Sequence, residues 1–277
     1  MTADPISAVP WWTTYIVEQR QGGQWLIGPS TLWIFHGPNE WRLTHKQESD
    51  SLMSESAVRC PVPESEWPHV VDPDVAASQI ARFSTRDEDP RVMLTPALAD
   101  RPVVARPEHA IYIPAGEEVT LYVSTPLWIQ VDLGGRAQHE VPAYRPSDTW
   151  FGPSTREGEL CYATRTTGRL QLENLPLHPH RAVTPLLLRN RASDQLLLER
   201  VQIPTQHLAL FASPDHMLWT QAVTLHREEN VEGARVQIEP GAPPAVADAK
   251  RVAAPREALR QNLVMSTFKA ISALFSS

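Results

Sequence analysis

Hydrophobic and polar residues alternate over short stretches in most of the chain, a pattern typical of half-buried β-strands. In the N-terminal part, turn residues interrupt this pattern at Gly22-Gly23, Gly28-Pro29 and residues 37–39. Residues 46–91 are more polar and less periodic, and the pattern there favours strands only around Val58 and at residues 80–83. The N-terminal runs predict a meander of short antiparallel strands at residues 12–17, 24–29, 30–35 and 40–44.

The strongest strand pattern predicts one strand at residues 119–123 and its successor at residues 127–133. A hairpin turn is expected directly afterwards, at Gly134-Gly135. Two further strands are expected at residues 160–166 and 168–172. Together these segments predict a first β domain over residues 10–176, after a loose lead-in at residues 1–9.

Residues 176–180, Pro-Leu-His-Pro-His, predict a stiff connector, because proline restricts both itself and the residue before it. Beyond the connector, five apolar runs fall within residues 181–242. They predict a smaller β-sandwich, either with immunoglobulin-like topology or as an extension of the first sheet.

The C-terminal segment has a different pattern. After an alanine-rich linker at residues 243–254, Pro255 occupies a helix-start position, and apolar residues then recur at spacings of three and four. This pattern predicts an amphipathic helix over residues 255–277. The expected fold is all-β, with two β-sandwich-like domains and this C-terminal helix. The apolar face of the helix consists of Leu259, Leu263, Val264, Phe268, Ile271, Leu274 and Phe275.

Composition agrees with many short strands joined by fixed turns, because 26 of the 277 residues are proline and nine are tryptophan. The net charge of −7 disfavours binding to duplex nucleic acid. Cys60 and Cys161 lie far apart and fit no metal-ligand spacing, so we expect reduced thiols and a cytoplasmic protein. The N-terminus has no signal-peptide pattern, and no apolar run approaches the roughly 20 residues of a membrane span.

Candidate chemistry concentrates in residues 147–163. Asp148 and Glu159 have the chemistry of a general acid and base, and Trp150 and Phe151 beside them suit a pocket for a carbohydrate-like molecule. The structural alternative is that Ser147 and Asp148 satisfy backbone amides at a turn while the two aromatic residues anchor the core. The sequence favours this structural interpretation, since no catalytic motif accompanies the carboxylates.

Other residues also have both a functional and a structural interpretation. His178 and His180, with Glu173, are of the types that bind metals, but a connector proline separates the two histidines. Cys161 is a nucleophile by type, yet its apolar neighbours favour a small buried residue. We therefore expect no metal and no cofactor. Tryptophans suit sugar stacking, but their position in alternating strands favours core packing for Trp25, Trp33, Trp41 and Trp128.

The predicted terminal helix has three interpretations. It binds a protein partner or a second copy of the chain, packs back on a β domain, or lies on a membrane surface. Its proline- and alanine-rich tether favours a contact beyond the body of the protein. Few basic residues accompany it, which disfavours an anionic bilayer.

Several segments resemble an uncharacterised prokaryotic family, domain of unknown function 432. The Ser-Asp-Thr-Trp-Phe-Gly block that starts at Ser147 is the most specific of them. The resemblance covers about residues 11–240. The matching segments are residues 25–29 with Leu32-Trp33 and Glu40-Trp41, residues 101–104 with Arg106-Pro107, residues 124–128, residues 147–153 with 158–163, and residues 218–220.

The family that the chain resembles has no established activity. Members of this family resemble neighbours of small-conductance mechanosensitive channel proteins. The resemblance therefore implies that the chain is a cytoplasmic accessory of such a channel. We therefore expect a non-enzymatic binding or regulatory protein that engages its partner through the terminal helix. The alternative is a binder or hydrolase of a small carbohydrate-like ligand that uses Asp148 and Glu159 near Trp150.

Overall fold

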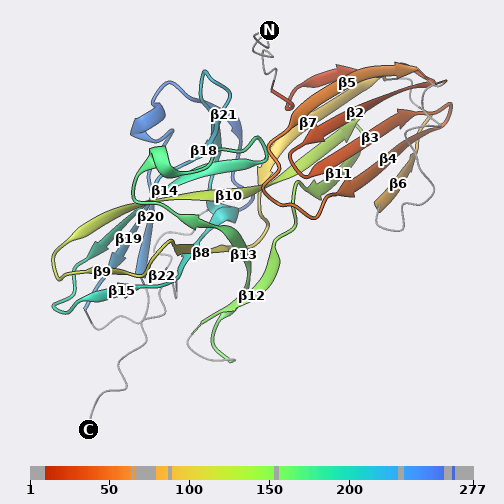
Figure 1. The fold of residues 1–277 in the computed structure, drawn as a ribbon. Helices are drawn as coiled ribbons and strands as arrows, with labels where there is room; N and C mark the ends of the chain where they lie inside the picture. The colour runs from red at the N-terminus through yellow and green to blue at the C-terminus, as the bar shows by residue number, and fades with distance from the viewer. Residues whose placement is uncertain are drawn as a thin grey trace. The chain divides into compact units, whose positions relative to one another are not determined.

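The computed structural model describes residues 10–63, 65, 79–86, 89–152, 156–229, 234–258 and 264–265. The predicted all-β class is confirmed, because strands dominate the described part of the chain (Figure 1). Helical structure there consists of 3-10 turns such as η2 (Leu172–Asn174), η3 (Thr205–His207) and η4 (Pro244–Val246). No helix in the described ranges has the length and apolar character to span a membrane.

The chain forms two compact units built from interleaved segments. The first combines residues up to Ala97 with Leu127–Tyr144 and His178–His180, and the second takes the remaining segments. The long strand β10 (Glu118–Leu133) contributes residues 118–126 to the second unit and residues 127–133 to the first. The sequence-based division into residues 10–176 and 181–242 followed chain order, whereas long-range strand pairing determines these units.

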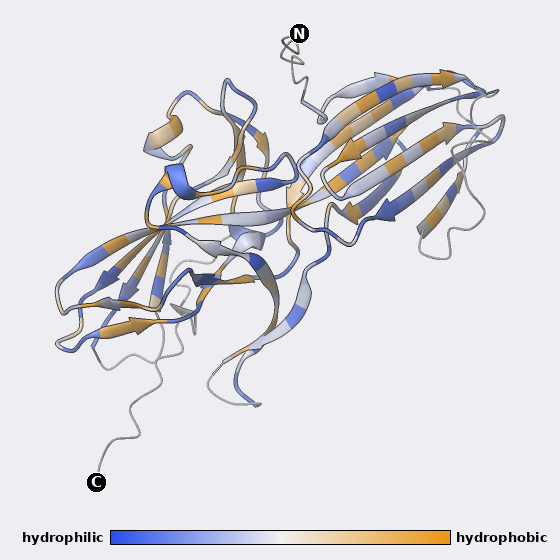
Figure 2. Ribbon diagram, in the orientation of Figure 1, coloured by the Kyte–Doolittle hydropathy of each residue, from blue (hydrophilic) through white to orange (hydrophobic). Residues whose placement is uncertain are grey.

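Five antiparallel strands form one sheet of the first unit, in the order β5-β2-β3-β4-β6. The expected turns at Gly28-Pro29 and residues 37–39 connect its hairpins. Hydrophobic and hydrophilic residues alternate along these strands (Figure 2). The strands are β2 (Gln21–Ile27), β3 (Ser30–His36), β4 (Glu40–Gln47), β5 (Ser56–Pro63) and β6 (Gln79–Ser84).

The predicted turn at Gly22-Gly23 is wrong, since both glycines lie inside β2. The reason is packing: the ring of Trp25 occupies the space that a Cβ atom at position 23 would need. Glycine within a strand often marks such a close approach.

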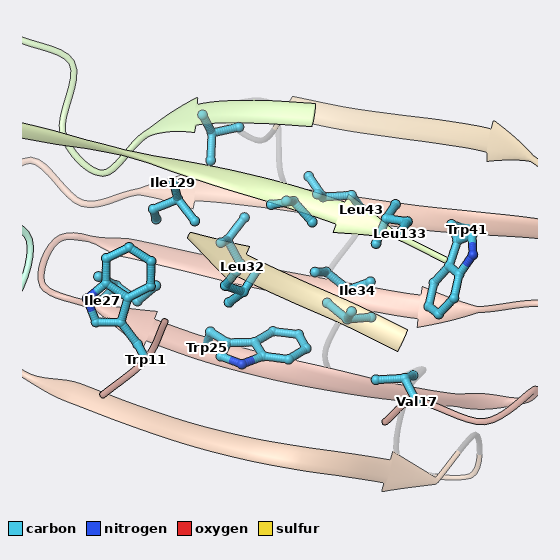
Figure 3. Close-up of a cluster of buried hydrophobic side chains, with 14 of the residues drawn as sticks. Trp11, Val17, Trp25, Ile27, Leu32, Ile34, Trp41, Leu43, Ile129 and Leu133 are labelled. Atoms are coloured by element: carbon cyan, nitrogen blue, oxygen red, sulfur yellow. The ribbon is translucent and has the colours of Figure 1, made fainter. Parts of the chain in front are cut away.

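The second layer of the first unit packs its apolar face against this sheet. It consists of β1 (Thr14–Ile16), β7 (Arg91–Leu98), residues 127–133 of β10, and β11 (Ala137–Pro142). The Gly134-Gly135 hairpin joins β10 to β11, as predicted. Side chains from both layers form one core cluster, which includes Trp25, Trp41 and Ile129 (Figure 3). The first unit therefore has two layers of strands around one core, and these two tryptophans are core residues.

Trp128 is also buried, at 6% exposure, whereas Trp33 is only half-buried. Strand β10 corrects a second expectation, because the predicted strands at 119–123 and 127–133 are one continuous strand. Pro126 lies within it, opposite Arg181.

The second unit has β14 (Arg181–Asn190) at its centre. This strand pairs antiparallel with residues 118–126 of β10, and parallel with β18 (Leu218–Thr220) and β19 (Val223–Arg227). Immunoglobulin-like sandwiches have antiparallel sheets, so the observed pairing differs from that expectation. Further strands of the same sheet are β17 (Leu210–Ala212), β20 (Ala234–Ile238), β21 (Lys250–Ala253) and β22 (Val264–Met265).

A four-stranded sheet of the second unit carries the candidate site, in the order β12-β13-β8-β16. Its strands are β8 (Val103–Pro107), β12 (Ser147–Phe151), β13 (Glu159–Gly168) and β16 (Val201–Ile203). A two-stranded sheet pairs β9 (Ile111–Ile113) with β15 (Leu196–Leu198).

The described residues of the C-terminal segment do not form the predicted helix. Residues 255–258 are non-helical, and Val264 and Met265 pair with Arg235 and Ala234 as strand β22. Apolar spacing alone could not reveal this pairing with β20. The other predicted helix-face residues lie outside the described residues: Leu259, Leu263, Phe268, Ile271, Leu274 and Phe275.

Candidate functional site

Strands β12 and β13 form a hairpin (Figure 1). This hairpin contains all four residues of the predicted pocket. Its register pairs Asp148 with Tyr162, Trp150 with Leu160, and Phe151 with Glu159. Directly opposed residues of an antiparallel pair share a face, and successive residues alternate between faces. Asp148 and Trp150 therefore lie on one face, which we call the outer face, and Phe151 and Glu159 lie on the other, the inner face.

This geometry corrects the predicted acid–base pair. Asp148 and Glu159 are on opposite faces of one hairpin, so they do not converge on a shared substrate position. A general acid and base must both reach the reacting group. The hairpin therefore lacks the arrangement that a two-carboxylate hydrolase needs.

Two glycines define the end of the hairpin. Gly158 has φ +156°, and a Cβ atom there would lie 2.5 Å from the Phe151 carbonyl oxygen and 2.8 Å from Trp150 Nε1. A Cβ atom at Gly152 would collide with the backbone of residues 157 and 158. The strands approach this closely because both residues are glycine, and the indole of Trp150 packs over Gly158. The Trp-Phe-Gly block and its partner glycine thus form one packing unit.

On the outer face, the Tyr162 ring is buried beneath two arginines. The guanidinium carbons of Arg101 and Arg145 lie 5.4 and 5.9 Å from the ring centroid. Asp148 pairs with both guanidinium groups, at 3.5 Å from Arg101 and 3.3 Å from Arg145. The Tyr162 hydroxyl donates to Asp100 Oδ1 at 3.0 Å, and burial followed by the Asp100 charge raises the pKa of Tyr162. Asp148 is therefore part of an ion-pair network with Arg101 and Arg145.

Beside this network, two large apolar side chains are exposed on the same face. Trp150 is 43% exposed, and its cross-strand partner Leu160 is 45% exposed. Their neighbours on the adjacent positions are the buried Phe151 and Cys161, which face the other way. The alternation places the apolar pair outward on a hairpin whose opposite side is packed.

On the inner face, Glu159 accepts a short hydrogen bond from Gln202 Nε2. The same amide lies 3.4 Å from Cys161 Sγ, and the Arg200 guanidinium carbon lies 5.2 Å from the Phe151 ring centroid. Burial, with the Glu159 charge, raises the pKa of Cys161 to about 12. A thiol with that pKa stays protonated near neutral pH, which favours the structural interpretation of Cys161.

The histidine pair belongs to the first unit and packs against the β2–β3 turn. His178 Nδ1 lies 2.6 Å from Ser54 Oγ, and His180 Nε2 donates to the Ser51 carbonyl oxygen at 3.1 Å. The His180 ring fills the space beside Gly28, whose φ is +56°. The described ranges contain no group of three or more His, Cys, Asp or Glu side chains suited to hold a metal ion. Glu173 belongs to η2 of the second unit.

Two hollows lie away from the hairpin residues. One, of about 310 Å³, crosses β7, β10 and β11 of the first unit and is lined by Met93, Gln130, Asp132 and Glu140 among others. The other, of about 520 Å³, lies in the second unit beside Ile111, Tyr112, Arg169 and Leu170. No residue of the predicted pocket lines either hollow.

Sequence reasoning missed Arg101, Arg145 and Leu160 as parts of the outer face. Leu160 could have been found, because it alternates with buried Cys161 in a strand. The two arginines could not, since they reach Tyr162 from separate segments of the chain.

A model of the family described as "Protein of unknown function (DUF432)" matches residues 11–272. This match confirms the resemblance inferred from the motifs. No curated protein and no protein of solved structure matches the chain.

Proposed function

We propose a binding function without catalysis for this chain, which belongs to the DUF432 family of proteins of unknown function. The proposed binding surface is the outer face of the β12–β13 hairpin, centred on Trp150 and Leu160. The observation that carries the proposal is the exposure of this cross-strand apolar pair, at 43% and 45%.

Residue type and rigidity both favour a protein partner. Tryptophan, tyrosine and arginine dominate the residues that contribute most to protein–protein affinity. Here Trp150 projects from a hairpin whose strands are joined closely at Gly152 and Gly158. A side chain already held in place loses little conformational freedom on binding, so more of its contact energy contributes to affinity.

The surroundings of the pair have the composition of an interface rim. Arg101, Arg145 and Asp148 form a charged network over Tyr162, directly beside Trp150 and Leu160. An apolar centre with a polar, charged border is typical of specific interfaces. The separation of Asp148 from Glu159 supports a non-enzymatic role for the same hairpin.

The family resemblance implies a partner class, a small-conductance mechanosensitive channel, and a cytoplasmic location for this accessory. Such a channel is the first partner to test. The terminal segment with Leu263 and Phe268 is the alternative contact surface, expected from its apolar spacing.

The test compares three forms of the full chain as baits on solubilised membranes and soluble extract of the native host. These are the wild type, the Trp150→Ala/Leu160→Ala variant, and the control Tyr112→Ala. Tyr112 is an aromatic residue that is 62% exposed on another strand. We expect the double variant to lose a specific partner, with the affinity for that purified partner about 30-fold weaker, as for loss of a strong interface residue.

A fourth bait without residues 259–277 separates the two contact surfaces. If this truncation loses the partner while the double variant keeps it, the terminal segment is the binding surface. Equal recovery of every protein by the double variant and by Tyr112→Ala would refute the proposed hairpin surface.

A further inference from the structure

The second unit contains a buried arginine whose hydrogen-bond partners are all uncharged. Arg181 begins β14 and is 4% exposed. Its Nε donates to Ser124 Oγ at 2.7 Å, and its Nη2 donates to the Ser124 carbonyl oxygen at 2.5 Å. Nη2 also lies 2.7 Å from Thr164 Oγ1 and 3.0 Å from Thr166 Oγ1. These contacts join β10, β13 and β14.

The charge of this guanidinium is not neutralised by a described side chain. In the ranges that the structure covers, Arg181 forms no ion pair with an aspartate or glutamate. Burial lowers the pKa of Arg181 to about 10, so the group remains a cation at neutral pH. Buried charges are costly unless an opposite charge or a metal compensates them.

The N–H groups of the Arg181 guanidinium do not all have a described hydrogen-bond acceptor. A guanidinium carries five N–H groups, of which two belong to Nη1. Nη1 donates to no described residue, whereas Nε and Nη2 have the acceptors given above.

We propose that Nη1 of Arg181 binds a small inorganic anion, of the size range from chloride to phosphate. A water molecule could accept the two N–H donors, but only an anion also neutralises the buried charge. The hydroxyls of Thr164 and Thr166 lie beside the neighbouring Nη2 but are engaged with each other and with the Ser124 carbonyl oxygen, so Nη1 provides the contact with the ion. The small exposed area of Arg181 limits the site to compact ions. This site is independent of the proposed partner surface.

The first test measures the melting temperature of the full chain in sodium gluconate, with chloride or phosphate substituted at constant ionic strength. The wild type is compared with Arg181→Met and with the matched control Arg189→Met. Arg189 lies on the same strand, but it is only half-buried and pairs with Glu118. At about 100 times the dissociation constant, we expect the wild type and the control to gain about 5–10 °C, and Arg181→Met to gain nothing.

A response to chloride alone assigns a halide, and a response to phosphate alone assigns an oxyanion. Equal responses in the two methionine variants, or none in the wild type, would overturn the site.

The second test does not depend on the folding of a variant. In wild-type protein labelled with 15N-arginine, the Nη resonances of Arg181 are followed while each anion is added. A saturable shift of these resonances supports the site, because the anion contacts Nη1 directly. Resonances that stay unchanged in both titrations would contradict it.

Discussion

The two units contain buried clusters that reach the same degree of burial by opposite chemistry. Trp41 of the first unit is 1% exposed, and Arg181 of the second unit is 4% exposed. Trp41 lies among apolar side chains (Figure 3). Its ring stacks on His36, with ring centroids 3.9 Å apart. Arg181 is held by hydroxyl and carbonyl oxygens. The exposed fraction of a side chain alone therefore does not determine how much that side chain stabilises the fold.

The two side chains differ in the free energy of hydration that each loses when it is buried. Burying an indole removes a large apolar surface from water, at roughly 25 cal/mol per Å². Burying a guanidinium loses strong hydration, which its hydrogen bonds only partly regain. We therefore expect the aromatic cluster to dominate stability, and the arginine cluster to contribute little net stability for a similar volume.

The largest expected effect tests the aromatic cluster. Trp41→Ala should lower the free energy of unfolding by about 3–5 kcal/mol, because it leaves a cavity in the core of the first unit. Urea unfolding followed by circular dichroism measures this loss. The control is Trp150→Ala, which removes the same residue type at a 43% exposed position and should cost clearly less, about 1 kcal/mol. Equal losses in both variants would contradict the assignment of Trp41 to the core.

The second effect concerns His45, a buried polar residue on β4 of the first unit. Burial, with the nearby His139 charge, lowers the pKa of His45 to about 4 from the ordinary 6.5. Ser30 Oγ gives its proton to the Ala143 carbonyl oxygen, so His45 Nε2, 2.8 Å from Ser30 Oγ, is the donor in their bond. Nδ1 of the neutral ring must then take up a proton if His45 becomes charged.

The sign of the pH effect follows from this lowered pKa. Above pH 6.5 the imidazole is neutral in both states, and the full stability is present. As the pH falls from 6.5 to about 4, His45 becomes protonated in the unfolded chain but stays largely neutral in the folded chain. The free energy of unfolding therefore falls by about 3 kcal/mol. Urea unfolding at pH 7 and at pH 4 measures the loss.

His139 and His226 also have lowered pKa values and add to the same trend. The His45→Gln variant isolates the contribution of His45, since glutamine can still donate to Ser30 Oγ but does not titrate. This variant should lose about 3 kcal/mol less than the wild type between the two pH values. A pH dependence identical to that of the wild type would show that His45 does not resist protonation.

Alternation along the chain predicted strands at residues 12–17, 24–29, 30–35 and 40–44, which overlap β1 to β4 of the first unit. It predicted no strand at β11, and β5 showed only a trace around Val58 because most of its residues are exposed. It also predicted the turns at Gly28-Pro29 and Gly134-Gly135. It misplaced Gly22-Gly23, since a glycine inside a strand and a glycine in a turn look alike until the position of the Trp25 ring is known.

The candidate site could be predicted only in part, for a reason of register. Residues 147–163 were recognisable from their aromatic and glycine content, but the face of each carboxylate depends on which residues oppose one another. The pairing of Phe151 with Glu159 puts Asp148 on the opposite face, and a shift of one residue would reverse this result. The partners of Arg181 were beyond reach for a related reason, because Ser124 and Thr164 come from distant strands.

The smallest expected effect tests the arginine cluster directly. In a buffer without small inorganic anions, Arg181→Met should lower the free energy of unfolding by only about 1 kcal/mol. The methionine side chain fills much of the space, and the loss of a poorly compensated cation offsets the lost hydrogen bonds. The acceptors left behind still find partners, because Thr166 Oγ1 already donates to the Ser124 carbonyl oxygen at 3.1 Å. Urea unfolding of this variant beside Arg189→Met gives the comparison, and a loss as large as that of Trp41→Ala would show that the buried cation, not the aromatic core, is the stronger support.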